Sequence, residues 1–262
     1  MTSPSNRHAL LADKLVHPQF PRAGSYDLEW QFQNAMGPNP LWLAESLSEL
    51  LELTPGMRVL DLGCGRAVTS IFLSREFGVQ VVAADLWVQP HENWTRVAEA
   101  GLDAQVMPLH AEAHDLKFAH GYFDTIVSLD AYHYFGTDDL YLGYLVQFLR
   151  PGGQLGICVP ARTDAAEGTV PLHMDDAWDW DYHSFHGPRW WRRHWEKTGK
   201  VRIEHADLLP DGWRHWLRWE QLTALEGSAE WRKESAAWAE KLEEDAGQSL
   251  GFARVVARTP GG

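Results

Sequence analysis

The chain has only two cysteines, Cys64 and Cys158, and they do not form the C-x-x-C spacing of a structural zinc site or a redox dithiol. This usage fits a reducing environment, so we expect a cytoplasmic protein. The 13 histidines include no H-x-x-x-H pair on a predicted helix with a supporting acid. We therefore expect no metal site.

Long apolar runs and positive charge are also scarce. No segment approaches the roughly 20 apolar residues that cross a bilayer, and the first 15 residues lack the apolar stretch of a signal peptide. Lys and Arg number 23 against 36 Asp and Glu, a formal net charge of -13. Because phosphate-rich partners are bound through basic groups, we expect neither nucleic acid nor a membrane as partner. A local exception is the basic cluster RWWRRHW at 189–195.

Apolar runs alternate with amphipathic segments along most of the chain. Asn39 followed by Pro40 indicates a helix start, and Thr137 is predicted to cap a later helix that ends near Phe148. Strands are predicted at 58–62, 79–85, 105–109, 123–130, 154–159, 201–206 and 252–257, and further helices at 67–77, 92–100, 213–224 and 228–245. This alternation predicts an α/β fold with a mostly parallel sheet and helices on both faces.

The end of the first predicted strand carries the strongest functional signal. Residues 59–67 read VLDLGCGRA, so Asp61 is followed by two glycines, Gly63 and Gly65, and then by a helix. Glycines at this turn allow a ligand to approach the backbone closely. The second strand ends in another acid, Asp85, which can bind a ribose diol beside the same crevice. A nicotinamide-dependent dehydrogenase is disfavoured, because Val68 stands where the dinucleotide fingerprint has its third glycine.

The D-x-G-x-G pattern with the later acid resembles motif I of the class I S-adenosylmethionine (SAM)-dependent methyltransferases, in particular the ubiquinone/menaquinone-type, small-molecule branch. The resemblance covers residues 40–160 well and the remainder in outline. It implies a Rossmann-like, doubly wound, seven-stranded, mostly parallel sheet with a C-terminal aromatic cap insertion. It also implies SAM as cofactor, S-adenosylhomocysteine as product and no metal.

The same resemblance assigns the cofactor contacts. The loop with Asp61, Gly63 and Gly65 is expected to hold the amino-acid part of SAM, and Asp85 the ribose hydroxyls, with Leu86 beside the adenine. The segment HAEAHDLKF at 110–118 resembles the family segment whose acid accepts from the adenine amino group. Glu112 and Ala113 fall at that position. A solvated loop carboxylate is the alternative interpretation of Glu112.

The fourth strand ends in SLDAYHYF, at 128–135, where methyl transfer is expected. Asp130 is a candidate for the methionine ammonium or for orienting a neighbour, and Tyr132 for the substrate. His133 is a candidate general base, because an imidazole has an unperturbed pKa of about 6.5; a packing role is the alternative. The motif of base-modifying enzymes, Asn/Asp-Pro-Pro-aromatic, is absent here, which favours a small-molecule acceptor.

Aromatic residues crowd the segment after the fifth strand. Ten of the 14 tryptophans lie between 178 and 238. Trp180 and Trp191 are candidate substrate contacts on a lid, with Tyr26, Trp30 and Met36 facing them; core packing is the equal alternative. We expect a flexible segment at 1–25 and one methyltransferase domain at 26–262, with N-terminal helices at 26–55, the SAM-binding core at 56–160, and the cap insertion with the last strands at 161–262.

These features predict a SAM-dependent methyltransferase that acts by in-line displacement on a small, apolar or aromatic acceptor. An enzyme of this kind needs alignment of the acceptor and exclusion of water more than a demanding catalytic constellation. The alternatives are an RNA or protein methyltransferase, for which the 189–195 cluster is the candidate docking surface, and a non-catalytic SAM-binding protein.

Overall fold

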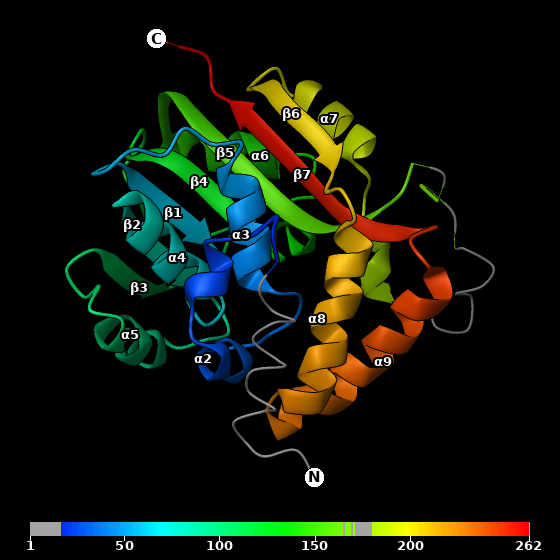
Figure 1. The fold of residues 1–262 in the computed structure, drawn as a ribbon. Helices are drawn as coiled ribbons and strands as arrows, with labels where there is room; N and C mark the ends of the chain where they lie inside the picture. Colours follow the sequence, from blue (N-terminus) through cyan, green and yellow to red (C-terminus); the bar gives the residue numbers. More distant parts are fainter. Residues whose placement is uncertain (1–16, 165, 169, 171–179, 262) are drawn as a thin grey trace.

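The computed structural model describes residues 17–164, 166–168, 170 and 180–261, and it contains a seven-stranded sheet in the order β3-β2-β1-β4-β5-β7-β6 (Figure 1). Strands β1 to β5 pair in parallel, whereas β7 is antiparallel to both of its neighbours. The expected seven-stranded, mostly parallel sheet is confirmed. The strands are β1 (Arg58–Leu62), β2 (Gln80–Asp85), β3 (Val106–His110), β4 (Phe123–Leu129), β5 (Leu149–Arg162), β6 (Arg202–Leu208) and β7 (Leu250–Arg258).

Helices cover both faces of the sheet (Figure 1). Val59 and Val127 belong to the core shared with α3, α4 and α8, whereas Leu60 and Ile126, their neighbours along the strands, belong to the core shared with α6 and α7. This alternation follows from the two-residue period of a strand. The helices are α2 (Leu28–Gln33), α3 (Pro40–Ser48), α4 (Val68–Phe77), α5 (Pro90–Glu99), α6 (Tyr141–Leu145), α7 (Pro188–Glu196), α8 (Gly212–Glu226) and α9 (Ala229–Asp245), with 3₁₀ turns η1 (Ala23–Ser25), η2 (Tyr132–Tyr134), η3 (Val146–Phe148) and η5 (Trp180–Ser184).

Of the two N-terminal helix caps predicted from sequence, the structure confirms one, Asn39, and corrects the other, Thr137. The side chain of Asn39 accepts hydrogen bonds from two backbone N–H groups in the first turn of α3, at 2.9 and 3.1 Å. The prediction that Thr137 caps the later helix is wrong. Helix α6 begins at Tyr141 with Leu140 at its N-cap position, and the carboxylate of Asp138 accepts from the backbone N–H groups of Leu140 and Tyr141 at 2.7 and 3.1 Å.

Residues 17–25 belong to the segment that we expected to be flexible, and the structure packs them instead. Phe20 is 1% exposed and stacks on Trp42 at 5.8 Å between ring centroids. The carboxylate of Glu45, on α3, accepts from the backbone N–H of Ala23 at 2.8 Å. A buried aromatic ring and a carboxylate that satisfies backbone donors hold this stretch against α3, which polar composition alone did not indicate.

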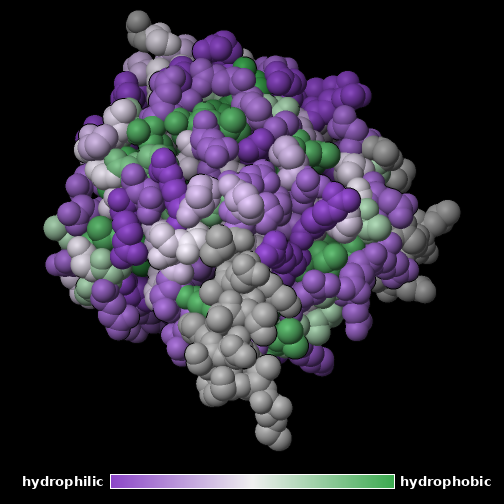
Figure 2. All heavy atoms as spheres, in the orientation of Figure 1, coloured by the Kyte–Doolittle hydropathy of each residue, from purple (hydrophilic) through white to green (hydrophobic). Residues whose placement is uncertain are grey.

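The surface facing the viewer in Figure 2 is mostly hydrophilic, with hydrophobic residues scattered across it. Within the described ranges, no helix is both long and apolar enough to span a bilayer.

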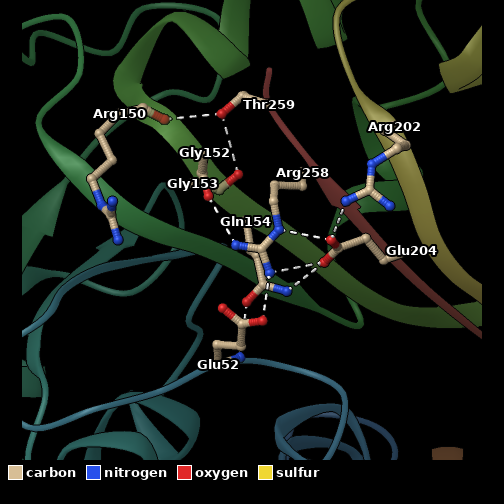
Figure 3. Close-up of polar contacts among 9 residues, drawn as sticks. All are labelled: Glu52, Arg150, Gly152, Gly153, Gln154, Arg202, Glu204, Arg258 and Thr259. Carbon is tan, nitrogen blue, oxygen red and sulfur yellow. Dashed lines mark hydrogen bonds and ion pairs between the residues drawn. The ribbon is translucent and has the colours of Figure 1, made fainter. Parts of the chain in front are cut away.

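A polar cluster ties the last strands of the sheet together (Figure 3). The carboxylate of Glu204, on β6, accepts from Arg258 on β7 at 2.7 and 3.1 Å and from the amide of Gln154 on β5 at 2.7 Å. Arg258 also pairs with Glu52 at 2.9 Å. The hydrogen bonds from Arg258 lower the pKa of Glu204 below its usual value. One carboxylate therefore links three neighbouring strands.

We predict that Glu204→Gln lowers the free energy of unfolding by about 1–2 kcal/mol at pH 7, because charge-assisted hydrogen bonds become neutral ones. A lowered carboxyl pKa contributes stability above the unfolded value, and that contribution is lost as the pH falls through the folded pKa. The variant should therefore approach wild type near pH 3. Urea unfolding at both pH values measures this.

Arg202→Ala is the matched control, because Arg202 contacts the same carboxylate from a side chain that is 73% exposed. It should cost less than about 0.5 kcal/mol. Equal losses in the two variants would contradict a dominant role for Arg258.

Candidate active site

A cavity of about 320 Å³ lies at the carboxyl ends of β1 to β4. Four loops line it, one after each of these strands, and the N-terminal strap, which we define as residues 34–40, adds a further part of the wall. Cavities of this size at the carboxyl edge of a parallel sheet are typical ligand sites. The loops that the sequence analysis assigned to the cofactor therefore surround a cavity in the structure.

The loop after β1 requires its two glycines. Gly63 has φ +76° and Gly65 has φ +51°, in the left-handed region. A Cβ on Gly63 would lie 2.4 Å from the Cβ of Ala131, and one on Gly65 would lie 3.2 Å from the sulfur of Met36. Both glycines line the cavity, so the backbone itself forms this wall.

Asp85 joins the loops that follow β1 and β2. Its carboxylate accepts from the backbone N–H of Gly65 at 2.8 Å and from those of Trp87 and Val88 at 2.8 and 2.9 Å. The side chain is buried at the cavity wall. A carboxylate has about four acceptor positions, so three backbone bonds leave one for a ligand hydroxyl.

Asp61 lies behind the glycine loop and does not line the cavity. One of its oxygens accepts from the hydroxyl of Ser70 at 2.6 Å, and the other has no partner among the described residues. The residue is 1% exposed, and this burial raises the pKa of its carboxyl to about 7. Asp61 thus connects β1 to the first turn of α4, one layer away from the hollow.

The loops after the neighbouring strands β2 and β3 both line the cavity. Leu86 and Trp87 are 47% and 69% exposed, and Ala113 is buried at the wall. Glu112 also lines the cavity, but both of its oxygens engage His114, through the backbone N–H and the ring Nδ1 at 3.0 Å each. The hydrogen bond from the ring lowers the pKa of Glu112.

Asp130 follows β4 in a left-handed conformation, with φ +52°. Its backbone is held by a hydrogen bond to the carbonyl of Cys158 at 2.9 Å, and its side chain lines the cavity. Gly37 of the strap lies so close that a Cβ there would be 2.7 Å from Oδ2 of Asp130. Burial, together with the charge of Glu220, raises the pKa of Asp130 well above its usual value.

His133 is not brought to the cavity. It is 1% exposed, and its ring packs against Tyr134 at 4.0 Å and Phe185 at 5.3 Å between centroids. Desolvation lowers the pKa of the imidazole to about 3. The tight η2 turn sends His133 inward and Tyr134, which is 51% exposed, to the cavity wall.

The structure also separates the expected substrate residues from the cavity. Tyr26 donates to Glu76 at 3.0 Å and stacks on Trp30 at 5.9 Å, away from the lining. Tyr132 and Trp191 are fully buried and meet edge to face at 5.6 Å. These four rings pack in or against the core, which for Trp191 is the alternative that the sequence left open. Trp180 begins η5, and its side chain lies outside the described part of the structure.

Met36 does line the cavity, as part of the strap. The strap is fixed from three sides: Arg66 donates to the carbonyl of Ala35 at 3.3 Å, Arg96 donates to the side chain of Asn34 at 2.8 Å, and Trp219 donates to the carbonyl of Gly37 at 2.8 Å. Sequence reasoning missed Asn34, Pro38 and Tyr134. The run of glycine and prolines at 37–40 was the available signal, because it marks an irregular segment just before α3.

Among the described residues, no group of three or more His, Cys, Asp or Glu side chains is arranged to hold a metal ion.

Comparison with known proteins agrees with this geometry. Residues 59–153 match a family model described as a methyltransferase domain. A methyltransferase, GfsG, from Streptomyces halstedii is 32% identical over 116 residues, which cover 44% of this chain and 42% of that protein. A ubiquinone biosynthesis O-methyltransferase from Erwinia tasmaniensis is 26% identical over 134 residues, 50% of this chain and 53% of that protein. The chain thus spans about half the length of these relatives.

Among solved structures, phosphoethanolamine N-methyltransferase 2 from Haemonchus contortus in complex with SAM superimposes with a TM-score of 0.72 at 21% identity. The match covers 95% of this chain and 60% of that one. The fold is therefore shared beyond the matched domain. Over residues 59–153, the chain is similar to the methyltransferase-domain family.

Proposed function

We propose that this protein binds SAM in the cavity and transfers its methyl group to a small-molecule acceptor. The observation that carries the proposal is the wall built from Gly63, Gly65 and Asp85, in which bare backbone and one buried carboxylate face a hollow of about 320 Å³. The methyltransferases among the relatives, and the SAM in the Haemonchus structure, support the same ligand.

The residues present fit such a ligand. The glycine loop leaves room for the amino-acid part beside the backbone, and the remaining acceptor position of Asp85 suits a ribose hydroxyl. Leu86 and Ala113 offer apolar surface for the adenine, with Glu112 at its edge. Asp61 supports this loop from behind through Ser70 rather than through a contact of its own.

The bound cofactor supplies a methyl carbon that is already electrophilic. The protein then has to hold the acceptor in line with that carbon and to keep water away. Asp130, Tyr134 and the strap with Met36 form the wall nearest the end of β4, so we assign acceptor positioning to them. Orientation of this kind lowers a bimolecular barrier by roughly 7–11 kcal/mol.

Several features favour a small acceptor in the cytoplasm over a macromolecule. The acidic charge of -13 opposes binding to nucleic acid. In the 189–195 cluster, Trp191 and Trp195 are buried in the core, and Arg189 and Arg192 pair with nearby carboxylates. Both cysteines are free thiols, as expected for a reducing compartment.

The first prediction for this function concerns Asp85. Asp85→Asn should weaken SAM and S-adenosylhomocysteine by about 10- to 100-fold, because a charge-assisted hydrogen bond and the anchoring of the glycine loop are both lost. Calorimetric titration measures this. Asp103→Asn makes the same charge change at an exposed position and should bind both ligands like wild type. If wild type binds NAD⁺ but neither SAM nor S-adenosylhomocysteine, a dehydrogenase becomes the favoured function instead.

The second prediction concerns His133. Its burial supports a packing role in which its ring positions the ring of Tyr134. With its pKa at about 3, the imidazole is neutral in the folded protein near pH 7. The unfolded chain binds the proton first, so folded stability falls as the pH drops from about 6.5 towards 3. Between pH 7 and pH 5 the free energy of unfolding of wild type should fall by about 2 kcal/mol because of this residue. His133→Phe lacks the imidazole and should not show this decrease.

Urea unfolding of wild type and His133→Phe at the two pH values measures that difference. His120→Phe, at an exposed position, serves as control and should follow wild type. If His133→Phe follows wild type as well, the imidazole exchanges protons in the folded state, and a general-base role regains support.

A further inference from the structure

The cavity wall at the end of β4 carries a carboxylate for which the described part of the chain supplies no counter-charge. No N–H or O–H group among the described residues donates to the side chain of Asp130, which is partly buried at the cavity wall. Its left-handed backbone conformation and the close approach of Gly37 hold it towards the hollow. A desolvated carboxylate without a partner is costly unless a proton or another cation joins it.

The basic side chains of the cavity lining are engaged elsewhere. Arg66 donates to the carbonyls of Gln33 and Ala35 at 2.8 and 3.3 Å and lies 3.8 Å from Glu230. His114 is hydrogen-bonded to Glu112 at the opposite side, after β3. Among the described residues, the lining therefore supplies no positive charge to Asp130.

A second acid stands behind the first. Glu220, on α8, is 2% exposed and accepts from the ring N–H of Trp216 at 3.0 Å. Desolvation raises the pKa of Glu220 to about 7, and its charge in turn raises that of Asp130. The negative potential at this wall thus comes from the loop after β4 and from α8, which are far apart in the sequence.

The opening of the same cavity is aromatic. Trp87, after β2, and Tyr134, after β4, meet edge to face at 5.8 Å between centroids. Both are largely exposed and both line the cavity. The faces of such rings attract cations, and Trp and Tyr do so most strongly.

We infer that the acceptor is a small amine, and that its nitrogen is held as a cation by Asp130 beneath the aromatic pair Trp87 and Tyr134. The inference rests on the proposed function and narrows the acceptor class. Phenolates and carboxylates, which react as anions, would meet repulsion from Asp130 and Glu220, whereas an ammonium group supplies the missing counter-charge.

The same placement serves the chemistry. The ammonium gives a proton to the carboxylate of Asp130, which leaves a neutral amine with a lone pair. That nitrogen forms the N–CH₃ bond as the C–S bond of SAM breaks, with its electron pair remaining on sulfur. The positive charge moves from sulfur to nitrogen while Asp130 holds the proton, so the negative charge near the developing cation comes from Glu220, which lies behind Asp130. Asp130 then returns its proton to water, and its carboxylate again faces a cationic nitrogen.

Binding tests the charge requirement without turnover. The probes are choline and its uncharged carbon analogue 3,3-dimethylbutan-1-ol, titrated calorimetrically into the protein saturated with S-adenosylhomocysteine. We expect wild type to prefer choline by about tenfold or more. Asp130→Asn should reduce the preference to about twofold or less, and Glu220→Gln should reduce it partly, because Glu220 acts through space.

Asp115→Asn is the matched control, since it removes one charge from an exposed side chain and should keep the full preference. Equal affinity for the two probes in wild type, or a preference that survives in Asp130→Asn, would overturn the inference. A loss of S-adenosylhomocysteine affinity in Asp130→Asn as large as the loss of choline affinity would also overturn it, by assigning the carboxylate to the cofactor.

An assay of labelled methyl transfer from SAM distinguishes the amine inference from the proposed methyltransferase function on which it rests. Benzylamine should be methylated in preference to benzyl alcohol, phenol and benzoate. Methylation of the oxygen compounds alone would leave the methyltransferase standing and overturn the amine assignment. A wild-type protein that binds neither SAM nor S-adenosylhomocysteine would remove the proposed function itself.

Discussion

The geometry of the site depends on one carboxylate that serves three backbone N–H groups. Asp85 accepts from Gly65, Trp87 and Val88, so the loops after β1 and β2 hold each other. The glycine loop has positive φ angles and few side chains of its own to fix it. Because Asp85 orders this loop, the backbone wall of the cavity exists before a ligand arrives, and less ordering is needed on binding.

The sheet topology explains why the cavity opens where it does. β1 lies between β2 and β4, so the chain leaves the sheet in opposite directions on its two sides. The strap fills the outer side of this gap and is fixed by Arg66, Arg96 and Trp219. Parallel strands thus create the crevice, and long-range hydrogen bonds to an irregular segment turn it into a cavity.

The strands could be predicted from sequence because buried central strands are continuous apolar runs, and the cofactor wall because glycines and acids sit at their ends. The direction of the side chains in the η2 turn could not be predicted from sequence. Tyr132 and His133 point into the core and Tyr134 points out, a choice made by packing against Trp191 and Phe185. The same limit applies to the strap, whose position is set by contacts with Arg66 in the loop after β1, with α5 and with α8 rather than by its own sequence pattern.

The two halves of the cavity have different origins. The cofactor wall comes from residues 59–153, the part that matches the methyltransferase domain. The acceptor wall depends also on α8, outside that part. There Trp219 holds the strap through the carbonyl of Gly37, and the next residue, Glu220, places its charge behind Asp130. One turn of a C-terminal helix therefore sets both the closure and the charge of this wall, so acceptor selection can differ between proteins that bind the cofactor alike.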